Sequence, residues 1–156
     1  MFFNRFLIYF CVPVFKRSIR YAPVKAADIM SSPPVIAGED AVIEDVARLM
    51  WEKGVGSILI VGAENRLVGI LTERDMLYAV SHLLIGKNVQ ARSLMSKNLV
   101  TASPDEELAS VVEKMRDFNI RHIPVVDQEG RPLGVVSSRD ILDFVVRLLS
   151  LFIRSA

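Results

Sequence analysis

Apolar and polar positions along the chain change period several times, and each change marks a predicted element. Apolar residues recur at helical spacing in two stretches, namely Ile43, Val46, Ala47 and Met50, and then Leu108, Val111, Val112 and Met115. Two short apolar runs follow each stretch, at 57–61 and 66–71 and again at 122–126 and 132–136, and they predict pairs of strands. The turn-forming residues 64–66 and 128–130 separate the strands of each pair. The pattern therefore predicts two units, each a helix followed by a hairpin.

A second helix is expected to follow each hairpin, opened by Thr72 in the first unit and by Ser137 in the second. Each unit also starts with a short helical turn, at 26–31 and 91–96, and a brief extended piece, at 33–36 and 98–101. The resulting order is strand, helix, strand, strand, helix, which gives a small sheet with helices on one face. A unit of this size buries too little surface to be stable alone.

The two units are copies of one another. When the sequence is shifted by 65 positions, residues 24–77 align with residues 89–142 without a gap, and about 16 of the 54 pairs are identical. Average composition predicts roughly three identical pairs. The identities include Met30 with Met95 and Gly69 with Gly134. We therefore expect an α+β fold in which two β-α-β-β-α repeats pack around a pseudo-twofold axis, and we expect any binding site to occur twice.

Both ends of the chain are more apolar than the repeats. The apolar run from Phe6 to Phe15 is too short to span a bilayer, which takes roughly 20 residues, so it predicts a peripheral membrane contact or an extra packing segment, or it reflects a start codon called too far upstream. The helix from Ile141 is apolar nearly all round, which predicts a buried helix or a subunit-facing helix in a homodimer. The predicted divisions are an N-terminal segment at 1–23, repeats at 24–88 and 89–142, and a C-terminal helix extension at 143–156.

Composition and charge mainly exclude classes of ligand and site. A net charge of +1 over 156 residues provides no general attraction for nucleic acid. Cys11 is the only cysteine, which excludes a disulfide framework and a Cys-rich metal site and suits a cytoplasmic location. The sequence offers no Cys-His nucleophile arrangement, no metal cluster around His82 and His122, and no Walker-type loop. We therefore expect neither an enzyme nor a catalytic cofactor.

A motif that ends each hairpin carries the candidate chemistry. It reads GILTERD at 69–75 and GVVSSRD at 134–140. A hydroxyl followed three residues later by a carboxylate resembles a capping box at a helix start, and that interpretation is sufficient for either copy alone. The backbone N–H groups at a helix start also attract phosphate, and a carboxylate one turn in can accept two hydrogen bonds from a ribose diol. Capping and ligand binding are compatible at these positions.

Residues 24–142 resemble a tandem pair of cystathionine beta-synthase (CBS) domains, also called a Bateman module. The resemblance rests on the paired DIMS and SLMS openings, the FNIRHIPVVD strand of the second copy, and the motif that ends each copy. It implies two sites for adenine nucleotides or S-adenosylmethionine between the copies, and a role in sensing energy state or regulating an enzyme or transporter.

The resemblance also assigns roles to individual residues. It gives the ribose hydroxyls to Asp75 and Asp140, and a phosphate oxygen or nearby backbone group to Thr72 and Ser137. The expected walls of the adenine slot are Val35 and Ile36 or Val100 and Thr101, together with Ile58 and Ile60 or Ile123, Pro124 and Val125. Such apolar residues are commonly just core. Arg74 and Arg139 are secondary phosphate candidates, with a solvent-exposed helix arginine as the alternative.

The two copies differ immediately before the first hairpin strand. Arg121 and His122 precede the strand of the second copy, whereas Gly56 and Ser57 stand at these positions in the first. In the family this position supplies basic groups to phosphate, so the two sites are expected to differ. The alternatives are an exposed surface charge for Arg121 and a satisfied strand histidine for His122.

The expected function is therefore a non-catalytic sensor that binds AMP, ADP or ATP as a homodimer. Two alternatives stay open. One is a structural or interaction module with vestigial clefts whose apolar ends dock an enzyme or transporter, and the other is a sensor of S-adenosylmethionine or a divalent ion.

Overall fold

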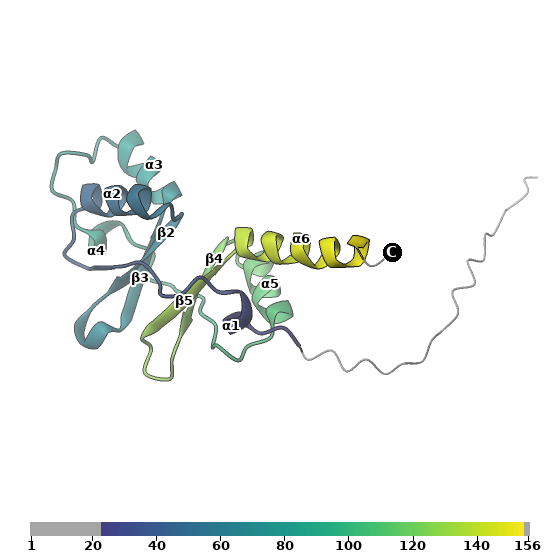
Figure 1. The fold of residues 1–156 in the computed structure, drawn as a ribbon. Coiled ribbons are helices and arrows are strands. Elements are labelled where there is room, and N and C mark those ends of the chain that lie inside the picture. The colour runs from purple at the N-terminus through teal and green to yellow at the C-terminus, as the bar shows by residue number, and fades with distance from the viewer. Residues whose placement is uncertain (1–22, 155–156) are drawn as a thin grey trace, which may run out of the picture.

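The computed structural model describes residues 23–154, so the expectations for the N-terminal segment lie outside the described residues. The first repeat contains α1 (Ala26–Ile29), β1 (Ile36–Gly38), α2 (Ile43–Lys53), β2 (Ser57–Val61), a 3-10 turn at Ala63–Asn65, β3 (Leu67–Thr72) and α3 (Glu73–Ser81). The second contains α4 (Ala91–Leu94), α5 (Leu108–Asp117), β4 (His122–Val126), β5 (Pro132–Ser137) and α6 (Ser138–Arg154). The two hairpins meet in the middle of the molecule and the long helices lie outside them (Figure 1). The predicted α+β fold is confirmed.

The sheets differ because of one residue. In the first repeat β1 runs parallel to β2, and the Leu59 N–H donates to the Val35 carbonyl at 3.1 Å. The matching position in the second repeat is Pro124, which has no N–H to donate. The predicted strand at 98–101 is therefore reduced to a single bridge between Ala102 and Val125, and β4 and β5 form a two-stranded sheet.

Each sheet has one face on its own helices and one face toward the other repeat. Ile58, Ile60 and Leu71 are fully buried with Val46 and Met50 in the first core, and the second core is built in the same way around Val111, Ile123, Val125 and Val136. Strand side chains alternate between faces, so Leu59 and its cross-strand partner Ile70 point away from this first core. Both are nonetheless buried, which places them between the two repeats.

The short opening helices are exchanged between the repeats. Ala26 of α1 belongs to the core of the second repeat, and Ala91 of α4 belongs to the core of the first. The exchange is reciprocal in the backbone: the carbonyl of Val24 accepts from the first N–H of α5 at 2.7 Å, and the carbonyl of Val89 accepts from the first N–H of α2 at 2.9 Å. These bonds satisfy helix N–H groups that have no partner inside their own helices.

The repeated glycines make room for this exchange. A Cβ on Gly134 would lie 2.7 Å from the Met30 Sδ and 2.9 Å from the Ser31 carbonyl, and a Cβ on Gly69 would overlap the Met95 side chain. Ser31 pairs with Val135 of β5, and Ser96 pairs with Ile70 of β3. The glycine in each motif is therefore explained by close packing of the exchanged segment, which capping alone does not require.

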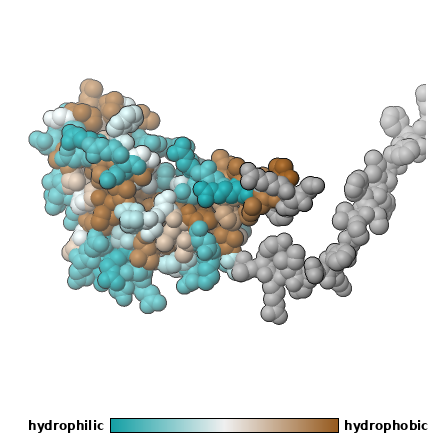
Figure 2. Space-filling model, viewed as in Figure 1, coloured by the Kyte–Doolittle hydropathy of each residue, from teal (hydrophilic) through white to brown (hydrophobic). Residues whose placement is uncertain are grey.

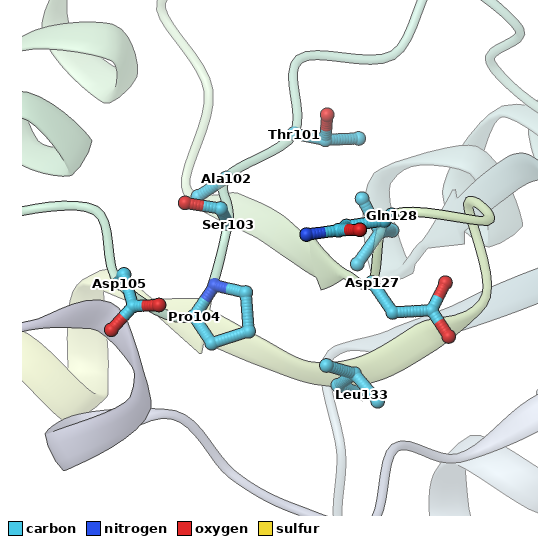
Figure 3. Close-up of a pocket in the computed structure, with 9 residues that line it drawn as sticks. Thr101, Ala102, Ser103, Pro104, Asp105, Asp127, Gln128 and Leu133 are labelled. Atoms are coloured by element: carbon cyan, nitrogen blue, oxygen red, sulfur yellow. The ribbon is translucent and has the colours of Figure 1, made fainter.

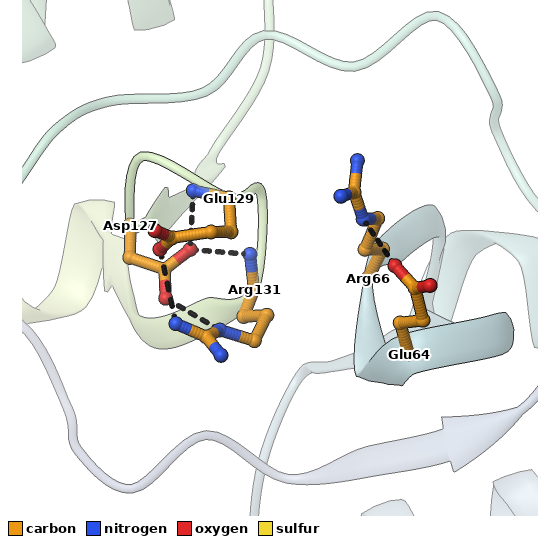
Figure 4. Close-up of polar contacts among 5 residues, drawn as sticks. All are labelled: Glu64, Arg66, Asp127, Glu129 and Arg131. Atoms are coloured by element: carbon orange, nitrogen blue, oxygen red, sulfur yellow. Dashed lines mark hydrogen bonds and ion pairs between the residues drawn. The ribbon is translucent and has the colours of Figure 1, made fainter.

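The two hairpin turns carry a repeated ion pair and lie next to one another (Figure 4). Arg66 pairs with Glu64 at 3.2 Å, and Arg131 pairs with Glu129 at 3.0 Å and with Asp127 at 2.7 Å. The pKa of Asp127 lies below its ordinary value, because the Arg131 backbone N–H and guanidinium stabilise the charged carboxylate. The Leu67 N–H donates to the Gly130 carbonyl at 2.9 Å, so the turns also join the two repeats.

Among residues 23–154, none of the helices combines the length and the apolar character needed to cross a membrane.

Candidate functional site: two repeated aspartates at the junction of the repeats

Both motif aspartates cap the helix in which they lie. The Thr72 N–H and hydroxyl each donate to the Asp75 Oδ2 at 2.7 Å, and the Ser137 N–H and hydroxyl donate to the Asp140 Oδ2 at 2.7 and 2.6 Å. The capping interpretation is confirmed in both copies. In each copy both bonds end on the Oδ2 atom of the aspartate. The cap therefore occupies one oxygen of each carboxylate and leaves the Oδ1 atom outside the cap.

The second oxygen of Asp140 faces the opening segment of the other repeat. The Ser31 hydroxyl donates to the Asp140 Oδ1 at 3.2 Å. A protein hydroxyl thus occupies the position where a ribose hydroxyl is expected to donate. Because Ser96 pairs with β3 as Ser31 pairs with β5, each site combines the motif of one repeat with the opening segment of the other.

The sequence-based site omitted these opening serines. The signal was present, since Met-Ser at 30–31 recurs as Met-Ser at 95–96. The repeat alone does not link Ser31 with Asp140, because the two residues are 109 positions apart in sequence and meet only through the exchange of the opening segments.

Gly56 and His122 both lie near the start of α3, the motif helix of the first repeat. The Gly56 carbonyl accepts from the Glu73 N–H at 3.2 Å, and a Cβ on Gly56 would lie 3.2 Å from the His122 Nε2 and 3.6 Å from the Glu73 carboxylate. His122 of the second repeat therefore approaches the motif of the first. Arg121 is exposed and accepts the Ser138 N–H through its carbonyl at 3.0 Å.

The pKa of His122 is lowered from the ordinary value of a histidine. Burial is the main cause of its lowered pKa, and the neighbouring Arg121 charge acts in the same direction. The negative charges of Glu73 and Asp140 act in the opposite direction. His122 is therefore mainly a neutral hydrogen-bonding group near neutral pH.

The apolar candidates divide into core residues and edge residues. Ile58, Ile60, Ile123 and Val125 are fully buried within the two cores, and Pro124 is also fully buried. Val35 and Val100 pack partly against the same cores. Ile36 is 37% exposed, and Thr101 is half-buried with its carbonyl accepting from Lys114 at 2.9 Å. The fully buried strand residues present no accessible surface to a ligand in this structure, whereas Ile36 and Thr101 do, so contact of the strand residues with adenine stays a prediction. Arg74 and Arg139 are exposed at the helix starts.

Two cavities lie near these residues, and they differ in character. The larger, of about 540 Å³, lies beside Thr101, Asp105, Gln128 and Leu133 in the second repeat alone, and contains neither motif aspartate (Figure 3). The smaller, of about 170 Å³, has Asp140 in its wall, facing Asp28 and Ile29 of α1, with Phe144 and Arg147 of α6 beside them. The smaller cavity is the better candidate for the ligand site, because a motif aspartate and the exchanged opening segment both line it.

The fold defines an internally repeated α+β module whose two motif aspartates occupy corresponding positions in the two repeats. Residues 26–82 and 91–147 each match the CBS domain model, so the chain belongs to the CBS domain family and contains two such domains in tandem. The family resemblance deduced from the sequence is confirmed.

Similar proteins share this module in different settings. An uncharacterized protein of Methanopyrus kandleri is 37% identical over 129 residues, which are 81% of this chain and 62% of that protein. A homoserine O-acetyltransferase of Methanohalobium evestigatum is 35% identical over 115 residues, and these cover 74% of this chain but only 23% of the enzyme. The chain thus spans less than two thirds of both relatives.

Two solved structures with the same fold are complexes with adenosine compounds. The CBS domain pair of protein MJ0100, in complex with 5′-methylthioadenosine and S-adenosyl-L-methionine, superposes with a TM-score of 0.73 at 31% identity and covers 80% of this chain and 97% of its own. The CBS domain protein PAE2072 of Pyrobaculum aerophilum, complexed with AMP, superposes with a TM-score of 0.70 at 30% identity, covering 75% of this chain and 89% of its own.

Proposed function

We propose that this chain is a non-catalytic regulatory module that binds AMP, ADP or ATP between its two CBS domains. The observation that carries the proposal is the divided use of Asp140, in which Oδ2 caps α6 while Oδ1 accepts a hydroxyl from the other repeat. A ribose diol offers the same donor as the Ser31 hydroxyl. The bound ligand would replace that contact and join the two repeats, and a partner that favours one arrangement would respond.

The neighbouring structures favour an adenosine ligand without selecting one. PAE2072 is complexed with AMP, and the MJ0100 pair with 5′-methylthioadenosine and S-adenosyl-L-methionine. The second of these complexes supports S-adenosylmethionine sensing as an alternative function of the same sites. We propose a cytoplasmic location, where adenine nucleotides and S-adenosylmethionine are available.

Isothermal titration of the purified protein tests the proposal. We expect AMP, ADP or ATP to release or absorb heat with a saturable stoichiometry of one or two molecules per chain. Binding of S-adenosylmethionine alone would support the alternative. Absence of heat with all four compounds would contradict ligand sensing and favour a structural module that docks a partner.

We further propose that the chain forms a homodimer through α6. Leu142, Val145, Leu149 and Ile153 lie at helical spacing along one face of α6 and are 42–77% exposed. Figure 2 shows hydrophobic residues gathered along this exposed helix. A second copy of the same helix is the expected cover, because a twofold axis lets one apolar stripe pack against itself.

A charge on this stripe is expected to separate the subunits. Leu149→Asp places a carboxylate in the proposed contact, where burial without a partner costs several kcal/mol, so sedimentation should shift from dimer to monomer. Ala63→Asp is the matched control, since Ala63 is an exposed turn residue away from the helices. A wild-type protein that sediments as a monomer, or a Leu149→Asp variant that stays dimeric, would contradict the proposed interface.

A further inference from the structure

The internal repeat allows the two sites to be compared position by position. In each repeat, the residue before the first strand accepts the N–H of the residue after the motif hydroxyl: Gly56 accepts from Glu73 at 3.2 Å, and Arg121 accepts from Ser138 at 3.0 Å. The next residue, the first of the strand, lies opposite the hydroxyl residue of the motif in the hairpin register: Ser57 opposite Thr72, and His122 opposite Ser137. These four positions surround the start of the motif helix, where a 5′ substituent of a ribose-bound ligand would lie.

The two sets of four residues carry opposite charge. The first set, around the start of α3, is Gly56, Ser57, Thr72 and Glu73, with a formal charge of −1. The second set, around the start of α6, is Arg121, His122, Ser137 and Ser138, with a formal charge of +1 when His122 is neutral, and its His122 ring also reaches the start of α3. Arg74 and Arg139 occur at the same position in both motifs, so they do not alter this difference.

The Glu73 carboxylate lies beside Gly56 at the start of α3, where a 5′ substituent of the ligand is expected. It lies 3.6 Å from where a Cβ on Gly56 would stand, and the His122 Nε2 lies 3.2 Å from the same point. Burial keeps the pKa of His122 low, so the ring does not supply a full positive charge that would offset Glu73. A phosphate at this helix start would meet a carboxylate. A phosphate at the Asp140 site would meet Arg121 and no carboxylate at the matching position, because Ser138 is uncharged and its hydroxyl faces the Arg121 carbonyl at 3.4 Å.

We propose that the two sites take different classes of adenosine compound: the Asp140 site takes a 5′-phosphorylated nucleotide, and the Asp75 site takes an adenosine whose 5′ substituent is uncharged or cationic, such as a thioether or a sulfonium. Glu73 and Ser138 are the residues that determine this difference. The proposal rests on the proposed function, because it assumes that adenosine compounds bind at the motif aspartates.

Reciprocal exchange of these two residues tests the proposal by isothermal titration with AMP and 5′-methylthioadenosine. The wild type should bind one AMP per chain and, at saturating AMP, one 5′-methylthioadenosine. Glu73→Ser should create or strengthen a second AMP site about tenfold, with a gain that shrinks as salt is raised. Ser138→Glu should weaken AMP about tenfold and leave 5′-methylthioadenosine binding unchanged. Glu52→Ser removes an exposed carboxylate from α2 and should leave both titrations unchanged.

The possible failures are distinguishable. If the wild type binds two AMP molecules with equal affinity, or if Glu73→Ser and Ser138→Glu both bind AMP as the wild type does, the charge assignment is overturned while the proposed function stands. If neither AMP nor 5′-methylthioadenosine nor S-adenosylmethionine binds the wild type, the proposed function is overturned and this assignment with it.

Discussion

Replacing Asp140 with alanine is expected to weaken AMP binding about 100-fold at its site and to lower the free energy of unfolding by about 1 kcal/mol. The binding loss follows from removing a carboxylate that would accept the ribose hydroxyls, because hydrogen bonds to a charged group contribute roughly 1.5–3 kcal/mol each. The stability loss follows from removing the acceptor for the Ser137 N–H and hydroxyl, since a lost cap costs about 1 kcal/mol. Titration calorimetry and urea unfolding measure the two effects separately.

Two further variants separate capping from binding. Asp140→Asn keeps an oxygen that can accept from the Ser137 N–H but loses the charge, so it should recover most of the stability and only part of the affinity. Asp45→Ala removes an exposed carboxylate from the first turn of α2 and should leave AMP binding unchanged. If Asp140→Ala loses stability yet binds AMP as tightly as the wild type, the aspartate is a helix cap and nothing more.

Replacing Gly134 with alanine is expected to lower the free energy of unfolding by about 2 kcal/mol, because extra volume in a packed site forces its neighbours to move. The added Cβ would lie 2.7 Å from the Met30 Sδ and 2.9 Å from the Ser31 carbonyl, and the carbonyl is held by the bridge to Val135. Gly38→Ala is the matched control, since a Cβ on Gly38 meets nothing within 4 Å. That variant should be neutral or slightly stabilised, because alanine reduces the freedom of the unfolded chain.

The contact with Met30 can be isolated by a double-mutant cycle. Met30→Ala should remove part of the penalty of Gly134→Ala, so the two changes together should cost at least 1 kcal/mol less than the sum of the single changes. Equal stability of Gly134→Ala and Gly38→Ala in urea unfolding would mean that the exchanged segment adjusts freely, and that the repeated glycine has another cause.

The elements of this fold could be predicted from sequence because their signals are local. Helical spacing of Ile43, Val46 and Met50 places α2, and the two short apolar runs on either side of a turn place the hairpin of β2 and β3. The hydroxyl-to-aspartate spacing of the motif predicts its cap, since the N-cap and the third helical residue meet whenever a helix begins there. The 65-residue repeat then extends each prediction to the second half of the chain.

The composite nature of the sites could not be predicted in the same way. The sequence predicts the helical turn at 26–31, but it does not predict that Ala26 of this turn packs in the core of the second repeat. The loss of the 98–101 strand depends on a missing N–H at Pro124, which matters only once the pairing partner is known. The approach of His122 to Glu73 likewise requires the two repeats to be placed side by side.

The exchange of α1 and α4 also makes the order of folding a property of the whole chain. The first core needs Ala91, and the second core needs Ala26, so neither is complete until segments of the chain on opposite sides of a hairpin have met. The bridge between Ser31 and Val135 closes a loop of more than a hundred residues, and contacts so distant in sequence slow folding. The two halves are thus obligate folding partners, and the same interlocking limits how far one half can rotate against the other without breaking backbone hydrogen bonds in both.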